Sequence, residues 1–451
     1  MKMKMKRILA AFLLLLAVVT VDGLALSAQE RPVPAFDRIL QEPQYAYLEY
    51  YLYKAPTEPA AKPPKGYKPV YISHYGRHGA RYNYKQEGYD DLKAFFEKAV
   101  GAGVLTAEGK ALAQKYLDAN KYFDGRAGDL TPIGWEEHYG IGLRMYRNYR
   151  QVFRKHPALD ARASTIQRSI MSMVACCDAL EEQDSRIRIA KETSESLMAI
   201  MNPPHSTHPF SELIRSGEKP YGKSWRNEVM EMKARDIRAD EYLPRFFTDL
   251  DWVEANFGKT NLELELYFLM ISTACTDVPV SFEGLFSPEE LCGLWEWRNY
   301  LYYQHWGPGE NGTNPAFLIS SVLLDDIMDR ADEDLASGRL GARLRFGHDT
   351  PIAMILCLMG VDGWATPVAH PSDIKYVYDF TNVPMGANLQ WVFYRNCKGD
   401  TLVRMMLNER DLPLPLPLPG DMAPYYRWSD FTSHYRSVTS AARARMADML
   451  K

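Results

Sequence analysis

Two arginines bracket a histidine where an apolar, strand-like run of the chain ends. In the segment Tyr71-Ile-Ser-His-Tyr-Gly-Arg-His-Gly-Ala-Arg-Tyr82, the residues Arg77, His78 and Arg81 follow one another around a turn loosened by Gly79. Arginine forms paired, charge-assisted hydrogen bonds with phosphate oxygens. A neutral imidazole can act as a nucleophile and form a covalent intermediate. This pattern therefore indicates phosphoryl-transfer chemistry on a dianionic phosphate monoester.

A second strand-like run ends in a histidine and an aspartate. It reads Leu344-Arg-Phe-Gly-His348-Asp349-Thr350-Pro351, and an apolar helical stretch follows over residues 352–360. Helix N-termini bind anions, and open α/β sheets place their sites at the carboxyl ends of strands. The pattern therefore places His348 and Asp349 in the same kind of site as His78.

The first of these segments resembles the phosphate-pocket motif Arg-His-Gly-X-Arg-X-Pro of the histidine acid phosphatases, which belong to branch 2 of the histidine phosphatase superfamily. Residues 77–79 and Arg81 match, and Asn83 stands where the family usually has proline. The second segment resembles the family's His-Asp motif at His348 and Asp349. The resemblance implies an α/β domain with a small helical domain over it.

Two segments between these motifs extend the resemblance. The stretch Asp160–Ser172 is similar to the family's Ser-X-X-X-Arg-X-X-X-Ser, which implies that Arg168 is a third pocket arginine. Arg162 competes for this role but does not match the motif, and by itself Arg168 is typical of a helix surface. The stretch Asp129–Gly134 resembles a Leu-Thr-X-X-Gly turn, after which Glu137 occupies a position where the family often has glutamine.

The resemblance implies a two-step hydrolysis of a small-molecule phosphate monoester. His78 attacks phosphorus and forms a phosphohistidine, Asp349 protonates the leaving oxygen, and the phosphate oxygens are held by Arg77, Arg81, Arg168 and His348. No metal and no cofactor is expected, because the arginines supply the positive charge. An aspartic acid as proton donor favours an acidic pH optimum.

The substrate stays open at this point. His348-Asp349-Thr350 resembles the acid phosphatases and phytases, whereas the multiple-inositol-polyphosphate branch typically has His-Ala-Glu, although Tyr82 matches that branch. An inositol phosphate such as phytate, a sugar phosphate and a broad range of monoesters all fit. Two rival functions are a phosphotransferase of the phosphoglycerate-mutase type and a non-catalytic phosphate-ligand-binding periplasmic protein.

The N-terminus has the pattern of a secretory signal peptide over residues 1–28, with a basic start, an apolar run over residues 8–19 and small residues after it. We therefore expect a periplasmic or secreted protein with no membrane attachment after cleavage. Removing these residues takes away four basic residues and one acidic residue, so the formal net charge changes from −4 to −7. A mildly acidic protein has no general electrostatic reason to bind nucleic acid. Oligomeric state is open.

The rest of the chain predicts an α/β fold with a mainly parallel sheet flanked by helices. Strands are expected at 68–74, 160–166, 186–192, 343–347, 388–395 and 401–407, with helices between most of them. Residues 29–204 and 341–451 are predicted to form this α/β phosphatase domain. Residues 205–340 read as a smaller, mainly helical cap inserted over the active-site edge.

Several residues carry weaker signals. His138, beside two glutamates, is predicted on a solvated helix face, whereas His74 is predicted to be packed in the sheet. His205 and His208 have the spacing of metal ligands but no acidic or cysteine partner, which favours a plain loop pair. Six cysteines could form disulfides in an exported protein, and the sequence does not choose between bonded and free.

Overall fold

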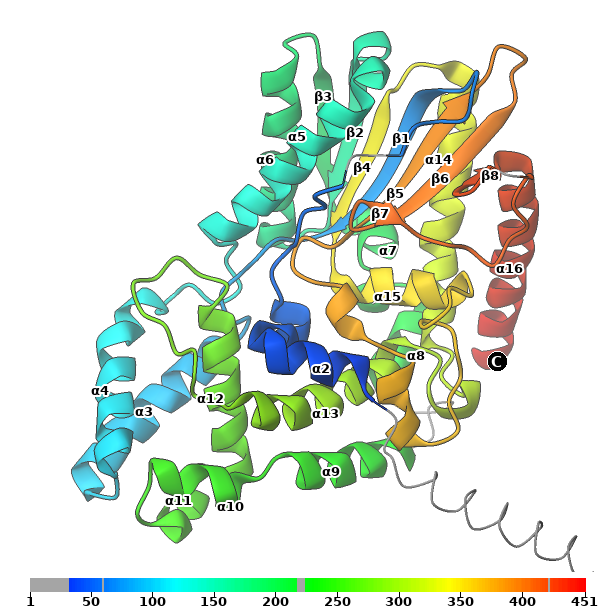
Figure 1. Ribbon diagram of the computed structural model, residues 1–451. Coiled ribbons are helices and arrows are strands. Elements are labelled where there is room, and N and C mark those ends of the chain that lie inside the picture. Colours follow the sequence, from blue (N-terminus) through cyan, green and yellow to red (C-terminus); the bar gives the residue numbers. More distant parts are fainter. Residues whose placement is uncertain (1–31, 59–60, 217–223, 421) are drawn as a thin grey trace, which may run out of the picture.

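The computed structural model describes residues 32–58, 61–216, 224–420 and 422–451, so the predicted signal peptide lies outside the described residues. An eight-stranded sheet lies in one half of the molecule and a group of helices lies in the other (Figure 1). The strands are β1 (Lys68–Arg77), β2 (Ala158–Ala163), β3 (Arg188–Thr193), β4 (Ala342–Gly347), β5 (Asn388–Arg395), β6 (Thr401–Leu407), β7 (Arg410–Asp411) and β8 (Tyr425–Arg427).

The sheet has the strand order β3-β2-β4-β1-β5-β6-β7, with β8 paired to β6. The four strands β3, β2, β4 and β1 run parallel, and the remaining strands pair antiparallel. The expected α/β class is confirmed, and the parallel part is the half of this mixed sheet that carries the motifs. β5 and β6 are antiparallel because only the turn at residues 396–400 joins them, and a parallel pair needs a much longer crossover.

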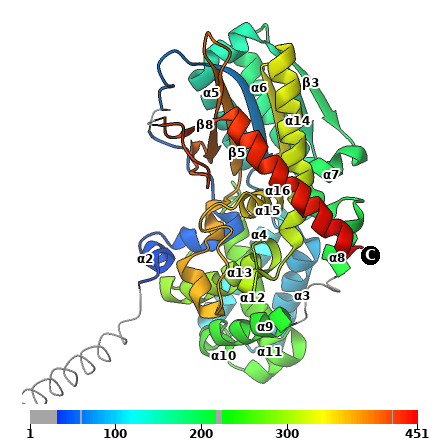
Figure 2. The same ribbon diagram turned by 90° about the vertical axis from the view of Figure 1, so that its right-hand side faces the viewer.

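Long helices cover both faces of the sheet. α5 (Pro132–Lys155) and α6 (Gln167–Gln183) lie on one face, and α14 (Ser321–Ser337) and α16 (Trp428–Met449) lie on the other (Figures 1 and 2). Successive side chains of a strand point to opposite faces of the sheet, so a strand between two layers of helices carries apolar residues at consecutive positions. Ile72 of β1 packs in the cluster with α5 and α6, while its neighbour Tyr71 packs against Phe393 on the opposite face.

A helical layer lies beyond the carboxyl ends of the parallel strands. Its members are α9 (Ser224–Asp236), α10 (Ala239–Tyr242), α11 (Leu250–Asn256), α12 (Lys259–Thr273) and α13 (Pro288–Trp306), with α3 (Gln86–Ala102) and α4 (Ala107–Ala119) beside them. Phe95 of α3 joins the two groups, since its ring contacts Phe247, Trp252 and Phe257. α14, although it falls within residues 205–340, packs on β1 and α16. The domain limits at 205 and 340 stay a prediction.

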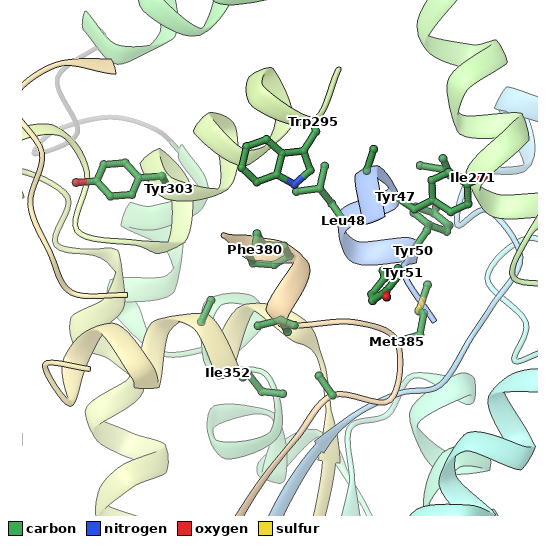
Figure 3. Packing of buried hydrophobic residues seen from close by; sticks show 14 of the residues in the cluster. Tyr47, Leu48, Tyr50, Tyr51, Ile271, Trp295, Tyr303, Ile352, Phe380 and Met385 are labelled. Carbon is green, nitrogen blue, oxygen red and sulfur yellow. The ribbon is translucent and has the colours of Figure 1, made fainter. Parts of the chain in front are cut away.

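The remaining helices are short or lie at the junction of the two halves: α2 (Pro34–Gln41), α7 (Met198–Met201), α8 (Pro209–Ser216), α15 (Asp349–Leu358), and the 3-10 turns η2 (Pro43–Tyr50), η5 (Pro203–His205) and η8 (Ala316–Ser320). Figure 3 shows that side chains from both halves meet there. Trp295 of α13 packs with Leu48 of η2, Phe380 and Ile352 of α15 in one buried cluster. The cap and the edge of the sheet therefore share a core.

Two further findings concern the cysteines and the length of the apolar helices. None of the six cysteines, all of which lie in the described residues, forms a disulfide; Cys397 is exposed and the other five are buried. Cys176 and Cys177 lie in the core, as their apolar helix predicts. Among the described residues, no helix has both the length and the apolar character needed to cross a membrane.

Candidate active site

Three parallel strands end side by side and bring the predicted site residues together. Arg77, the last residue of β1, pairs in register with Gly347, the last residue of β4. Ala163 at the end of β2 pairs with Phe346. Because these strands are parallel, the loops that follow them meet at one edge of the sheet. They carry His78 after β1, the start of α6 with Arg168 after β2, and His348 and Asp349 after β4.

His78 is held as a neutral imidazole. Its side chain is buried, and Nδ1 lies 2.9 Å from the carbonyl oxygen of Gly79. A carbonyl only accepts hydrogen bonds, so Nδ1 carries the proton and Nε2 keeps a free lone pair. Burial, followed by the charges of Arg168 and Arg77, holds the pKa of His78 well below its usual range. The imidazole is therefore unprotonated at neutral pH.

The loop that carries His78 passes against the start of α5 at a distance that only glycine allows. A Cβ atom on Gly79 would lie 2.3 Å from the carbonyl oxygen of Gly134. Thr131 caps α5 through the N–H of Gly134, and its own N–H donates to the carbonyl of Ala80. Ser172 of α6 accepts the N–H of Gly79 at 3.0 Å. The turn at 129–134 is thus a structural support for the loop.

Three guanidinium groups converge on this loop, those of the buried Arg77 and Arg81 and that of the half-buried Arg168. Nη1 of Arg77 donates to the carbonyl of Val383 at 2.9 Å, and Nη1 of Arg81 donates to the hydroxyl of Tyr50 at 2.8 Å. Nε and Nη2 of Arg77, Nε of Arg81 and Nε of Arg168 have no hydrogen-bond partner within the described part of the chain. Buried, charged donors without a hydrogen-bond partner suit the oxygens of a phosphate group.

Burial, followed by the like charge of Arg81, lowers the pKa of Arg168 to about 10. Arg168 therefore remains a cation at acidic and neutral pH. The cost of holding three such cations together is offset when a dianion binds among them, which makes the pocket selective for phosphate.

His348 and Asp349 stand at the start of α15. Nε2 of His348 lies 3.1 Å from the hydroxyl oxygen of Ser164, which can donate to it and leave the ring proton on Nδ1. Burial, followed by the charge of Arg168, lowers the pKa of His348 to about 3, so this ring is also neutral. Its ring centre lies 5.6 Å from that of His78.

Asp349 faces the cations from the first position of its helix. Oδ2 lies 3.0 Å from Nη2 of Arg77 as an ion pair that lacks hydrogen-bond alignment, and Oδ1 accepts the N–H of Thr350 at 2.8 Å. Burial pushes the pKa of Asp349 upward, but Arg77, His348 and Arg81 outweigh it, and the pKa lies below its usual value. A bound phosphate dianion would oppose those cations and return the pKa toward the range of a proton donor.

Two neighbours on α5 support the site in ways that the sequence did not reveal. His138 is fully buried, and its Nε2 donates to the carbonyl of Arg77 at 2.8 Å. The prediction of a solvated helix face was wrong, because Glu136 points outward while His138, two residues on, faces β1. Glu137 accepts the N–H of Ala80 at 2.7 Å and that of Tyr53 at 2.9 Å.

The other arginine and histidine candidates from the sequence are not among the residues that converge on His78. Arg162 pairs with Asp160 at 3.1 Å and faces Glu192, so it is a surface ion-pair residue. His74 is packed in the sheet, as predicted, against Phe346. His205 lies exposed at the pocket's edge, and no group of three or more metal-ligating side chains occurs in the described residues.

The model of the histidine phosphatase superfamily, branch 2, matches residues 76–408. The chain belongs to this family. It is 26% identical over 401 residues to Phytase A of Aspergillus awamori, which covers 78% of each chain. Phytase A of Aspergillus oryzae is 25% identical over 371 residues, covering 75% of this chain and 76% of the relative.

Solved structures of phosphatases share the fold. The multiple inositol polyphosphate phosphatase of Bifidobacterium longum in complex with phosphate has a TM-score of 0.74 at 20% identity, covering 87% of this chain and 97% of that one. The phytase from D. castellii has a TM-score of 0.64 at 18% identity, covering 88% and 85%. With the family established, the chain is a histidine acid phosphatase, an enzyme that hydrolyses phosphate monoesters.

Proposed function

We propose that this enzyme is exported and hydrolyses inositol polyphosphates such as phytate through a phosphohistidine intermediate on His78. The hydrogen bond from Nδ1 of His78 to the carbonyl of Gly79 carries the mechanistic part, because it leaves Nε2 as the only nucleophilic nitrogen of the ring. The three arginines beside it supply the charge that positions the phosphoryl group.

The reaction follows from these positions in two steps. Nε2 of His78 attacks phosphorus in line, the P–O bond to the leaving group breaks, and Asp349 gives its proton to the leaving oxygen. A water molecule then attacks the phosphohistidine and returns a proton to Asp349, which releases inorganic phosphate and neutral His78. Throughout, the phosphoryl oxygens are held by Arg77, Arg81, Arg168 and His348.

The relatives support the substrate class. Three curated relatives match over most of the chain, and each is a Phytase A. The same fold occurs in a B. longum phosphatase whose complex holds inositol hexasulfate, at a TM-score of 0.72. Sugar phosphates remain the alternative class. The signal-like residues 1–28 support export, which N-terminal sequencing of protein recovered outside the cytoplasm would test.

Phosphate release from p-nitrophenyl phosphate, phytate and a hexose phosphate tests the proposal, with chelator present throughout. Wild type is expected to prefer phytate, and His78→Ala to lose at least about 10³-fold in kcat because it removes the nucleophile. Arg162→Ala removes a nearby arginine outside the pocket and should keep full activity. Mass spectrometry of enzyme quenched in base should find phosphate on His78. Activity surviving in His78→Ala, or a preference for the hexose phosphate, would contradict the proposal.

A further inference from the structure

The end of α7, directly before η5, is fixed against the end of β4. The hydroxyl of Tyr75 donates to the carbonyl of Met201 at 2.8 Å. A Cβ atom on Gly347, directly before His348, would lie 2.3 Å from that same carbonyl oxygen. This contact needs glycine at position 347, and it fixes the position of the backbone that leads into His348 and Asp349. η5 in turn packs against α15, which begins with Asp349.

The loop after η5 is rigid because its polar side chains bond its own backbone. The hydroxyls of Ser206 and Ser211 both donate to the carbonyl of Pro203, at 2.9 and 2.7 Å. Nη1 of Arg215, from α8, donates to the carbonyls of Pro204 and Ser206, at 3.2 Å each. These two carbonyls flank His205, so the guanidinium group is placed beside the histidine.

His205 is exposed while both of its neighbours are buried, so its side chain stands out from a fixed backbone. Partial desolvation and Arg215 lower the pKa of His205, and Asp349 raises it. His205 also acts on the pKa of His348. Because η5 ends at His205 and packs against α15, whose first residue is Asp349, the imidazole lies on the Asp349 side of the pocket.

Resting on the proposed function, we propose that His205 and Arg215 form a second phosphate-binding subsite for another phosphate group of the same polyphosphorylated substrate. Imidazole and guanidinium groups beside a leaving group bind it only if it is itself an acceptor or an anion. An uncharged aromatic or alkyl leaving group gains nothing there. The subsite therefore distinguishes inositol polyphosphates from simple monoesters, while hydrolysis itself depends on His78 and the pocket arginines.

The test compares two substrates in the double variant His205→Ala/Arg215→Ala. We expect KM for phytate to rise about five- to tenfold, the size of one or two partly solvated charged hydrogen bonds, and kcat to change little. Kinetics on p-nitrophenyl phosphate should stay within about twofold, since its leaving group carries no phosphate. Arg238→Ala, which removes an exposed cap arginine paired with Glu241, is the matched control and should change neither substrate.

Because Arg215 also bonds the loop backbone, the single variant His205→Ala separates binding from loop stability. It removes one ligand and leaves both Arg215 hydrogen bonds in place, so phytate KM should rise by about half the effect of the double variant on a logarithmic scale. An equal loss on both substrates would show loop damage and overturn the subsite. Unchanged phytate kinetics would overturn it as well. If wild type hydrolyses p-nitrophenyl phosphate but not phytate, the proposed substrate class fails with it.

Discussion

At the scale of single residues, the pocket sets opposite requirements for its two reactive groups. His78 must be neutral to attack, and burial with the nearby arginines lowers its pKa to keep it so. Asp349 must carry a proton, yet Arg77 and its other cationic neighbours lower its pKa in the free enzyme. Both needs are met only when the dianionic substrate is bound, since its charge opposes the cations that act on Asp349. In the proposed mechanism, substrate binding and acid catalysis are therefore coupled.

Replacing Asp349 by asparagine should affect substrates according to their leaving groups. An alkoxide leaving group needs a proton, so kcat on an alkyl phosphate should fall by about 10²–10⁴-fold. p-Nitrophenolate leaves without one, and kcat for p-nitrophenyl phosphate should fall by less than about tenfold. Steady-state kinetics on both substrates checks this, with Asp160→Asn, outside the pocket, as the control. Equal losses on the two substrates would exclude Asp349 as the general acid.

The sequence predicted which pocket residues come together because each lies in a short motif at a strand end. It did not predict the partners of those residues. Tyr50, which accepts from Arg81, and Val383, whose carbonyl accepts from Arg77, are brought in by tertiary packing and carry no local pattern. The wrong prediction for His138 has a local cause. The acidic residues before it suggested a solvent-exposed helix face, but Glu136 and His138 are two positions apart and therefore face nearly opposite sides of the helix.

At the scale of elements, the site depends on how closely the loop after β1 approaches α5. Gly79→Ala would place a Cβ 2.3 Å from the carbonyl oxygen of Gly134 and 2.6 Å from its Cα, and neither backbone atom can move without shifting α5. We expect a loss of about 1–3 kcal/mol in the free energy of unfolding and more than about tenfold in kcat/KM. Denaturant unfolding and kinetics measure both.

Gly101→Ala is the matched control for this change. Gly101 lies in the last turn of α3, and a Cβ there has no atom within 4 Å. Alanine should stabilise the helix by up to about 1 kcal/mol and leave activity unchanged. If Gly79→Ala behaved like this control, the close approach of the loop to α5 would not be what positions His78.

The strands were predicted more accurately than the organisation of the helices. The strands β1, β2 and β4 end within or directly before a motif, and the motif marks the end of the strand in the sequence. The helices of the cap have no such marker, and α3 packs on them although it comes long before residue 205. α14 returns to the sheet because its apolar stripe faces β1, and only the assembled fold shows which surface an amphipathic helix covers.

At the scale of the whole molecule, buried ionisable groups determine how stability depends on pH. His74, His138 and His348 have pKa values lowered to about 3, 4 and 3, chiefly by burial, and that of His78 is also lowered. Below about pH 6.5 the unfolded chain protonates these histidines and the folded protein does not, so acid destabilises the fold. Glu137 and Glu263 act in the opposite sense, since burial raises the pKa of each to about 7.

Near pH 5.5 a histidine whose pKa is lowered to about 3 takes up nearly one proton on unfolding, so each such histidine makes the free energy of unfolding fall by about 1.4 kcal/mol per pH unit toward acid. His74→Leu is the sharpest test, because His74 is fully buried and neither ring nitrogen has a hydrogen-bond partner among the described residues. Denaturant unfolding at several pH values between 5 and 6.5 should show a slope about 1.4 kcal/mol per pH unit shallower than in wild type.

His434→Leu, at an exposed position of α16, controls for the loss of a histidine outside the core. If His74→Leu kept the wild-type slope, the buried histidine would not be a source of the acid sensitivity.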